Sequence, residues 1–299
     1  MTALRLATRR SPLALVQAAS VRDRLLARGV DAELVHIDTD GDRRVDVALE
    51  TLGGQGVFAV EVQRALLDGR ADIAVHSAKD LPSATPEGLT LTCVPERRDA
   101  ADVLVGRSLA GLGPGATVAT GSPRRRALLL ERRPDFNVVG LRGNMATRLA
   151  TAGSRGVDAV IAAAAALERL GHQDMVAERL DPAWFVPQVG QGAIALEVRV
   201  DERSTAALLD AINDRAALRA LTAERAFLRE LGAGCSIPAG AYATCDDETI
   251  SISGVMLADD GARSVRATMV GDDPEHLGRE LARRLRDDEG GSTLTGWRV

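Results

Sequence analysis

The sequence predicts an α/β protein with two similar α/β domains joined by a hinge, followed by a small C-terminal α+β domain. Three observations predict this architecture. Apolar strand-like segments alternate with helix-like segments through the first two thirds of the chain, as in parallel α/β units. The pattern strand, Ser-Pro, helix occurs twice, with ATRRSP at 7–12 and ATGSP at 119–123. From about residue 215 the pattern changes, and 299 residues exceed one ordinary compact core.

The first domain begins with the apolar segment 3–8, which we expect to be a strand. Ser11 and Pro12 then supply an N-cap and a first-turn proline for a helix. Buried strands are expected at 31–37 and 71–78, with a glycine-rich loop and a second helix between them. In such parallel units, ligands bind at the carboxyl ends of the strands.

The second domain repeats this scheme, with strand-helix units expected at 115–134, 137–152 and 157–171. The segment QVGQGAIALEVR (188–199) is interpreted as a strand that returns to the first domain's sheet. The chain would then cross between the two domains twice, once on leaving the first domain and once on returning. Two such crossovers form a hinge, with a cleft between the domains. We therefore expect domain 1 at 1–98 plus 189–210, domain 2 at 99–188 and domain 3 at 211–299.

The third domain opens with the helix RAALRALTAERAFLRELG, which Gly232 stops. TISISGVML and RSVRATMVG alternate in polarity and are joined by ADDGA, which predicts a β-hairpin. A final helix runs through HLGRELARRLR. The domain also carries GAGCSIP, where small residues around Cys235 permit close approach of another group. Context alone leaves a functional and a structural Cys235 equally open, whereas Cys93 and Cys245 are interpreted as structural cysteines inside apolar elements.

Composition argues against several classes of protein. The formal net charge of −5 gives no electrostatic attraction to DNA, and 2% aromatic residues leave no stacking platform for single-stranded nucleic acid. No apolar run reaches the roughly 18 residues of a transmembrane helix. RRSPLALVQAAS resembles a twin-arginine signal, but it continues directly into VRDRLLARG and is interpreted as an amphipathic helix. Three scattered cysteines form no disulfide framework, so we expect a cytoplasmic protein without nucleic-acid or membrane partners.

Arginine is used almost to the exclusion of lysine. Of the 37 basic residues, Lys79 is the only lysine and 36 are arginine. Several arginines fall at predicted strand-to-helix junctions: Arg9, Arg10, Arg124, Arg125, Arg126, Arg142 and Arg148. Guanidinium groups and helix N-termini both bind carboxylate or phosphate, so their repeated placement predicts a site for a polyanion. Surface solvation is the alternative for any single arginine.

Other chemistries find little support in the sequence. GGQGVF lacks the Lys-Ser/Thr of a P-loop, and no G-x-G-x-x-G follows a strand at the right place. The four histidines show no ligand spacing and no C-x-x-C occurs, so no metal is expected. His76, inside an apolar strand, is interpreted as a hydrogen-bonded core residue. No G-x-S-x-G supports a Ser-His-Asp triad.

A series of motifs resembles the porphobilinogen deaminase (hydroxymethylbilane synthase) family over nearly the whole chain. In order they are ATRRSPLAL, ADIAVHSAKDLP, RRRALLLERRPD, LRGNMATRL, VGQGA, and LTAERAF followed by GAGCSIP. The resemblance implies three domains, the first two similar to each other and to periplasmic binding proteins. It implies a transferase of tetrapyrrole biosynthesis that joins four porphobilinogen molecules head to tail, with loss of ammonia, to give hydroxymethylbilane. A monomer is expected from the family.

The resemblance also implies a role for individual residues. The primer is a dipyrromethane cofactor held by a thioether to Cys235, and Asp80 matches the catalytic aspartate. Each pyrrole ring brings an acetate and a propionate, which is the polyanion that the arginines anticipate. The residues expected to bind cofactor or substrate are Arg9, Ser11, Ser77, Lys79, Ser122, Arg124, Arg125, Arg142, Arg148, Arg169 and Gln191.

Some positions depart from the family pattern. Gln55 and Val60 stand where relatives usually carry basic residues, which puts in doubt an electrostatic role for the loop 53–62. Gly121 and Pro123 replace a usual serine and leucine, while Ser122 and the arginines remain, so we expect the anion site to persist. The alternative function is a two-domain protein that binds an organic anion without chemistry. That alternative explains the arginines and the hinge, but it requires neither Cys235 nor the Lys79-Asp80 pair.

Overall fold

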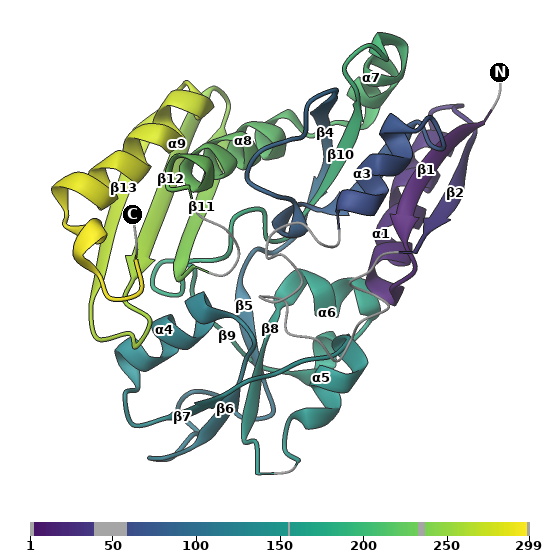
Figure 1. Cartoon of the computed structure of the whole chain (residues 1–299). Helices are drawn as coiled ribbons and strands as arrows, with labels where there is room; N and C mark the ends of the chain where they lie inside the picture. The colour runs from purple at the N-terminus through teal and green to yellow at the C-terminus, as the bar shows by residue number, and fades with distance from the viewer. Residues whose placement is uncertain (1–2, 39–58, 155, 233–236, 298–299) are drawn as a thin grey trace.

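The computed structural model describes residues 3–38, 59–154, 156–232 and 237–297, and the elements of these residues form three β-sheets (Figure 1). Two five-stranded sheets belong to the α/β part of the chain, and a three-stranded sheet belongs to its C-terminal part. The predicted fold class is confirmed: two similar α/β sheet domains are followed by a smaller domain of antiparallel strands and helices.

The first sheet has the order β2-β1-β3-β10-β4. Strands β1, β2 and β3 are parallel, whereas β10 runs antiparallel to both β3 and β4. Helices α1 and α3 cover opposite faces, because Ile73 packs with the apolar side of α1 and Ala74 with that of α3. The bounds are β1 Leu4–Arg9, α1 Pro12–Leu26, β2 Ala32–Ile37, α3 Val60–Leu67, β3 Ile73–Ser77, β4 Leu89–Arg97, β10 Ala193–Arg199 and, after β10, α7 Arg203–Leu209.

The second sheet, β7-β6-β8-β5-β9, repeats this arrangement. Strands β6, β7 and β8 are parallel, and β5 runs antiparallel to β8 and β9. The predicted repeat is therefore confirmed at the level of strand order and direction. The bounds are β5 Asp102–Val105, β6 Thr117–Ala119, α4 Pro123–Arg132, β7 Asn137–Val139, α5 Met145–Thr151, β8 Ala159–Ala163, α6 Ala164–Leu170 and β9 Val176–Arg179.

The chain passes between the two α/β domains twice, in two crossover segments. The chain leaves the first sheet after β4 to form β5 of the second, and it returns after β9 to form β10 of the first. The returning strand predicted at 188–199 is confirmed at Ala193–Arg199. We propose the predicted domain limits, 1–98 with 189–210, 99–188 and 211–299, because they separate the three sheets.

The C-terminal domain packs two helices against the antiparallel sheet β11-β12-β13. The predicted hairpin is confirmed as β12 and β13, but the sequence analysis missed β11, whose small residues AGAYATCD give a weak strand signal. The side of α8 that faces the first α/β domain places Ala217 and Leu221 against Ala78 and Leu81. The bounds are α8 Arg215–Glu230, β11 Ala239–Asp246, β12 Thr249–Leu257, β13 Ser264–Gly271 and α9 Pro274–Arg283.

Candidate functional site

Each α/β domain has a helix that begins with a serine N-cap followed by a proline. Ser11 and Ser122 are N-caps whose side-chain oxygens accept hydrogen bonds from the backbone N–H groups of Ala14 and Arg125, and a proline follows each cap. Since β1 ends at Arg9 and β6 at Ala119, both helix N-termini lie at the carboxyl ends of parallel strands. The predicted caps are confirmed, and they place the candidate residues at the carboxyl ends of the parallel strands, where open α/β sheets generally bind ligands.

Asp80 lies in a pocket at the carboxyl ends of β1 and β3. Its lining includes Arg9, Ser11, Ser77 and Asp80, so the fold brings these four predicted residues together. The Arg9 guanidinium lies 4.0 Å from the Asp80 carboxylate, and about a third of the Asp80 side chain is exposed. Gln17 also lines this pocket, and its side-chain oxygen accepts a 2.9 Å hydrogen bond from Ser77. We refer to this hollow as the Asp80 pocket.

Lys79 lies beside Asp80 in a single 3-10 turn, Ala78–Asp80, that follows β3. The pKa of its ammonium group is lowered to about 8, chiefly by burial and also by Arg125 and Arg148, against the opposing effects of Asp80 and Asp102. The backbone oxygen of Lys79 accepts a 3.1 Å hydrogen bond from Gln188. The only lysine of the chain therefore lies among cations, with two carboxylates as counter-charges.

A second hollow, the Lys79 pocket, combines residues of all three domains. Its polar lining is Lys79, Ser122, Arg124, Gln188 and Arg225. Ile237 and Ala239 also line it, and they follow directly on residues 233–236. The Nε atom of Arg124 is buried and has no hydrogen-bond partner among the described residues, which is unusual for a buried donor.

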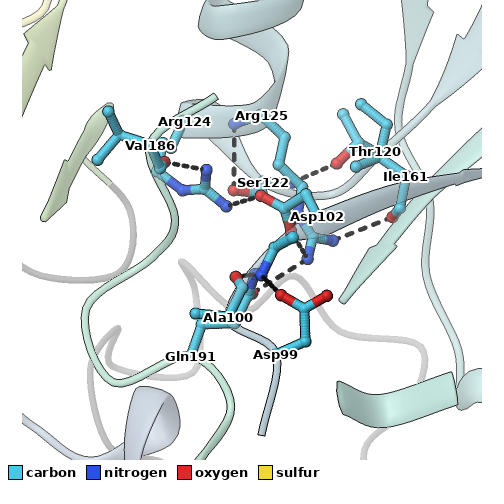
Figure 2. Close-up of polar contacts among 11 residues, drawn as sticks. Asp99, Ala100, Asp102, Thr120, Ser122, Arg124, Arg125, Ile161, Val186 and Gln191 are labelled. Carbon is cyan, nitrogen blue, oxygen red and sulfur yellow. Dashed lines mark hydrogen bonds and ion pairs between the residues drawn. The ribbon is translucent and has the colours of Figure 1, made fainter. Parts of the chain in front are cut away.

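Arg124 and Arg125 converge on one carboxylate, that of Asp102 (Figure 2). Arg124 Nη2 lies 2.7 Å from Oδ2, and Arg125 Nη2 lies 2.7 Å from Oδ1. Gln191 donates to the same Oδ1 at 2.9 Å, and all four side chains are buried. Burial by itself would raise the pKa of Asp102, but Arg124, Arg125 and Gln191 hold it below its ordinary value. The sequence analysis missed Asp102, although it is an isolated acid at the start of an apolar strand.

The remaining arginines differ in their surroundings. Arg148 is half-buried near Lys79, and burial together with Arg125 lowers its pKa. Arg142 is exposed in the loop before α5. Arg169 lies at the crossovers, where it contacts Glu96 at 3.0 Å and donates to the Gly192 backbone oxygen at 2.9 Å. Arg10 and Arg126 are exposed, with Arg10 paired to Asp38 and Arg126 donating to the Val138 backbone oxygen.

A turn in the second crossover, residues 188–191, contacts both the Lys79 turn and Asp102. Gln188 donates to the backbone of Lys79, and Gln191 donates to Asp102. Gly190 has φ +74°, and a Cβ atom there would lie 2.8 Å from the backbone carbon of Ala78. The VGQGA motif therefore requires glycine at this position because the turn lies directly against the backbone of the Lys79 turn.

The C-terminal domain is joined to this turn by a buried carboxylate that the sequence analysis missed. Glu224 of α8 accepts hydrogen bonds from Gly190 N–H at 2.7 Å and from Arg97 Nη1 at 2.7 Å. Arg225, the next residue, donates to the backbone oxygen of Pro82 at 2.9 Å. Two neighbouring residues of α8 thus contact the turn at 188–191 and the segment that follows Asp80.

The cysteines differ in their surroundings. Cys235 lies outside the described residues. Cys93 is fully buried, and burial raises the pKa of its thiol to about 12, which makes it a poor nucleophile. Cys245 is only half-buried and contacts the backbone oxygen of Asp247, so it is less enclosed than the expectation of a structural cysteine in an apolar element implies.

The structure gives a local reason for two of the departures from the family pattern, Gly121 and Pro123. A Cβ atom at position 121 would lie 2.6 Å from the backbone oxygen of Leu141, so Gly121 allows the loop that carries Arg142 to approach β6 closely. Pro123 takes the first position of α4, where proline is favoured. Val60 is exposed at the start of α3, and Gln55 lies outside the described residues.

The described segments also bear on the expectations about histidine, metal ions and membrane spans. His76 is buried with Nε2 3.1 Å from Glu197 Oε2, which confirms the interpretation as a core residue. Within these segments, His, Cys, Asp and Glu side chains form no group of three or more suited to a metal ion. The helices of the described part are also too short or too polar to cross a membrane.

Comparisons with known proteins identify the family. A model described as "Porphobilinogen deaminase, dipyromethane cofactor binding domain" matches residues 4–207, and one described as "Porphobilinogen deaminase, C-terminal domain" matches residues 218–287. The protein named porphobilinogen deaminase of Roseiflexus sp. (strain RS-1) is 44% identical over 97% of each chain. Its namesake in Syntrophotalea carbinolica is 43% identical over 95% of this chain and 92% of that protein.

Solved structures show a more distant likeness. The Bordetella pertussis BvgS VFT2 domain is 20% identical with a TM-score of 0.43, covering 70% of this chain and 86% of that chain. A periplasmic substrate-binding protein of an ABC transporter from Coxiella burnetii is 16% identical with a TM-score of 0.43, covering 72% of this chain and 94% of that chain. Scores at this level support no conclusion about function.

Proposed function

The chain belongs to the porphobilinogen deaminase family, and on that premise we propose how its residues carry out the family's reaction. The activity is that of hydroxymethylbilane synthase, a transferase that joins four porphobilinogen molecules head to tail with release of ammonia. The dipyrromethane cofactor of the family supplies a covalently held primer for this chain growth. A binding protein without chemistry is not favoured by these relatives.

The observation that carries the residue assignment is the set of cations around the Lys79 pocket. Arg125 and Arg148 lower the pKa of Lys79, and the carboxylates of Asp80 and Asp102 raise it. The buried Nε of Arg124 has no hydrogen-bond partner in the described part of the chain. Each pyrrole ring brings two carboxylates, so a two-ring primer supplies the acceptors that these donors require. The residues present therefore fit the cofactor.

We assign the two pockets different occupants. The Lys79 pocket adjoins Ile237, which is two residues from Cys235 in the sequence, so Lys79, Ser122 and Arg124 would hold the primer, with Arg125 and Gln191 behind them. The Asp80 pocket, with Arg9, Ser11 and Ser77, would take the incoming porphobilinogen.

Three further arginines complete the assignment. Arg142 and Arg148, at the edge formed by α5, would bind carboxylates of the growing chain. Arg169 is assigned to the same carboxylate-binding group, and its contacts with Glu96 and Gly192 also favour a role in holding the crossover.

We assign Asp80 the role of the catalytic carboxylate. When ammonia leaves the aminomethyl group of porphobilinogen, positive charge develops on the substrate. A carboxylate close to the pyrrole N–H stabilises that charge and can accept a proton at Oδ. Asp80 lies in the same pocket as the carboxylate-binding candidates Arg9 and Ser11, so a substrate held there is within its reach.

The mass of the intact protein tests this function. Protein produced in cells that make porphobilinogen is expected to exceed its sequence mass by two linked pyrrole units, located by peptide mapping at Cys235. Cys235→Ser should fold but carry no adduct, because a hydroxyl is a far poorer nucleophile than a thiol. An adduct on Cys93 or Cys245, or unmodified wild-type protein without turnover, would contradict the proposal. The cytoplasmic location and the monomeric state stay predictions from the sequence.

A further inference from the structure

The carboxylate of Asp102 is the common partner of three side chains that come from two segments of the chain. Arg124 donates to Oδ2 at 2.7 Å, and Arg125 donates to Oδ1 from Nε at 3.0 Å and from Nη2 at 2.7 Å. Gln191, from the second crossover, donates to Oδ1 at 2.9 Å. Figure 2 shows the two guanidinium groups converging on this one buried carboxylate.

These contacts fix the orientation of both arginines. Arg124 Nη1 also donates to the Val186 backbone oxygen at 2.6 Å, and Arg125 Nη1 donates to that of Ile161 at 3.0 Å. With the ends of each guanidinium held in this way, the Nε edge of Arg124 is the one without a hydrogen-bond partner among the described residues, and Arg124 lines the Lys79 pocket. A guanidinium held at two points loses less conformational entropy when a carboxylate binds.

Asp102 also places the arginines relative to Lys79. Gln191 holds the Asp102 carboxylate, and Gln188, three residues earlier in the same turn, holds the backbone oxygen of Lys79 at 3.1 Å. The negative charge of Asp102 offsets two buried guanidinium groups that otherwise repel each other, and it also acts on Lys79. The charge of Asp102 and its hydrogen bonds thus both act on residues that line the Lys79 pocket.

We propose that Asp102 is a positioning residue of the primer site: its buried carboxylate, held by Gln191, sets Arg124 and Arg125 in the orientation that receives a carboxylate of the primer. This proposal rests on the proposed function. It differs from a role in stability alone, because it requires that the loss of Asp102 slows priming even in protein that folds.

The test follows priming in protein produced without porphobilinogen. Each variant is incubated with porphobilinogen, and the rate at which the intact mass gains two pyrrole units is measured. Asp102→Asn keeps the shape and removes the charge, and its priming rate is expected to fall about tenfold or more, as for the loss of one charge-assisted contact. The matched control is Asp72→Asn, which breaks a bidentate pair with Arg5 at the opposite end of the first sheet and should prime like wild type.

A second readout uses the only lysine of the chain. Reductive methylation with carbon-13 formaldehyde labels only Lys79 and the α-amino group, so NMR reports the titration of Lys79 directly. Removal of the Asp102 charge should lower the pKa of Lys79 below about 8, whereas Asp72→Asn should leave it unchanged. An unchanged Lys79 titration in folded Asp102→Asn protein would contradict the electrostatic part of the proposal.

Gln191→Met is the second variant in case Asp102→Asn does not fold. It leaves every charge in place and removes the amide that holds Asp102, so slower priming is expected with a cooperative melting transition retained. Wild-type priming by Gln191→Met together with unfolded Asp102→Asn overturns the proposal, as does wild-type priming by folded Asp102→Asn. The two proposals fail separately: a wild type that gains no mass contradicts the proposed function itself.

Discussion

The side-chain oxygen Oε2 of Glu224 accepts a 2.7 Å hydrogen bond from the backbone N–H of Gly190, which joins α8 to the second crossover. The other oxygen lies 2.7 Å from Nη1 of Arg97, at the end of β4, and the carboxylate is fully buried. One side chain thus joins the C-terminal domain to the first α/β domain and to the turn beneath Lys79. Helix α8 ends at Glu230, a few residues before Cys235 in the sequence.

Glu224→Gln should lower the free energy of unfolding by about 3–5 kcal/mol, because it leaves the Arg97 guanidinium buried without its counter-charge. Urea denaturation measures the loss. The matched control is Glu230→Gln on the same helix, whose pair with the half-exposed Arg283 should contribute less than about 1 kcal/mol. Equal losses in the two variants would show that burial of Glu224 has no special consequence.

Arg124→Leu and Arg142→Leu should differ in their effect on stability, although the resemblance gives both arginines the same role. Arg124 is buried against Asp102, so its loss should lower the free energy of unfolding by about 3 kcal/mol as well as impair priming. Arg142 is exposed, so Arg142→Leu should melt like wild type and lose only activity. Thermal melts and turnover rates of both variants test this. Wild-type turnover by Arg142→Leu would return that arginine to the surface-solvation alternative.

Lys79 should titrate near pH 8 in the protein without primer, because burial and the neighbouring Arg125 disfavour its charged form. The native state then binds fewer protons than the unfolded state between about pH 8 and the ordinary lysine value. The unfavourable contribution of Lys79 to stability is therefore largest below pH 8 and disappears as the pH rises through that window.

Bound carboxylates favour the ammonium, so priming should raise the pKa of Lys79, and the affinity for the anion should fall above pH 8. Carbon-13 NMR of the methylated protein, before and after addition of porphobilinogen, measures both values. A downward shift on priming would contradict the assignment of Lys79 to the primer site.

Asp80→Asn should reduce turnover by at least roughly 100-fold, since the amide keeps the shape but neither accepts a proton nor offsets the substrate's positive charge. Asp80→Glu keeps the charge and should retain more activity than Asp80→Asn. Both variants should melt near the wild type, because the Asp80 side chain is about a third exposed and its ion pair with Arg9 is long, at 4.0 Å. Wild-type turnover by Asp80→Asn, or unfolding of both variants, would show that the catalytic assignment is wrong.

The sequence by itself determined the elements whose signals are local. Ser11-Pro12 and Ser122-Pro123 marked two helix starts, and the alternating segments marked the hairpin β12–β13, because caps and periodicity depend on a few neighbouring residues. It also placed Arg9, Asp80 and Arg124 at the carboxyl ends of strands, since that position follows from the order of strands and helices. The repeat of strand and helix was visible for the same reason.

Only the tertiary structure decided what these side chains contact. A sequence shows that Arg124 and Arg125 follow a strand, but it does not show that Asp102, which precedes both of them along the chain, is buried between them. Glu224 carried a weak signal, because it shares the buried face of α8 with Ala217, Ala220 and Leu221 at helical spacing. Its partners Gly190 and Arg97 come from distant segments, and burial and charge pairing depend on how those segments meet in space.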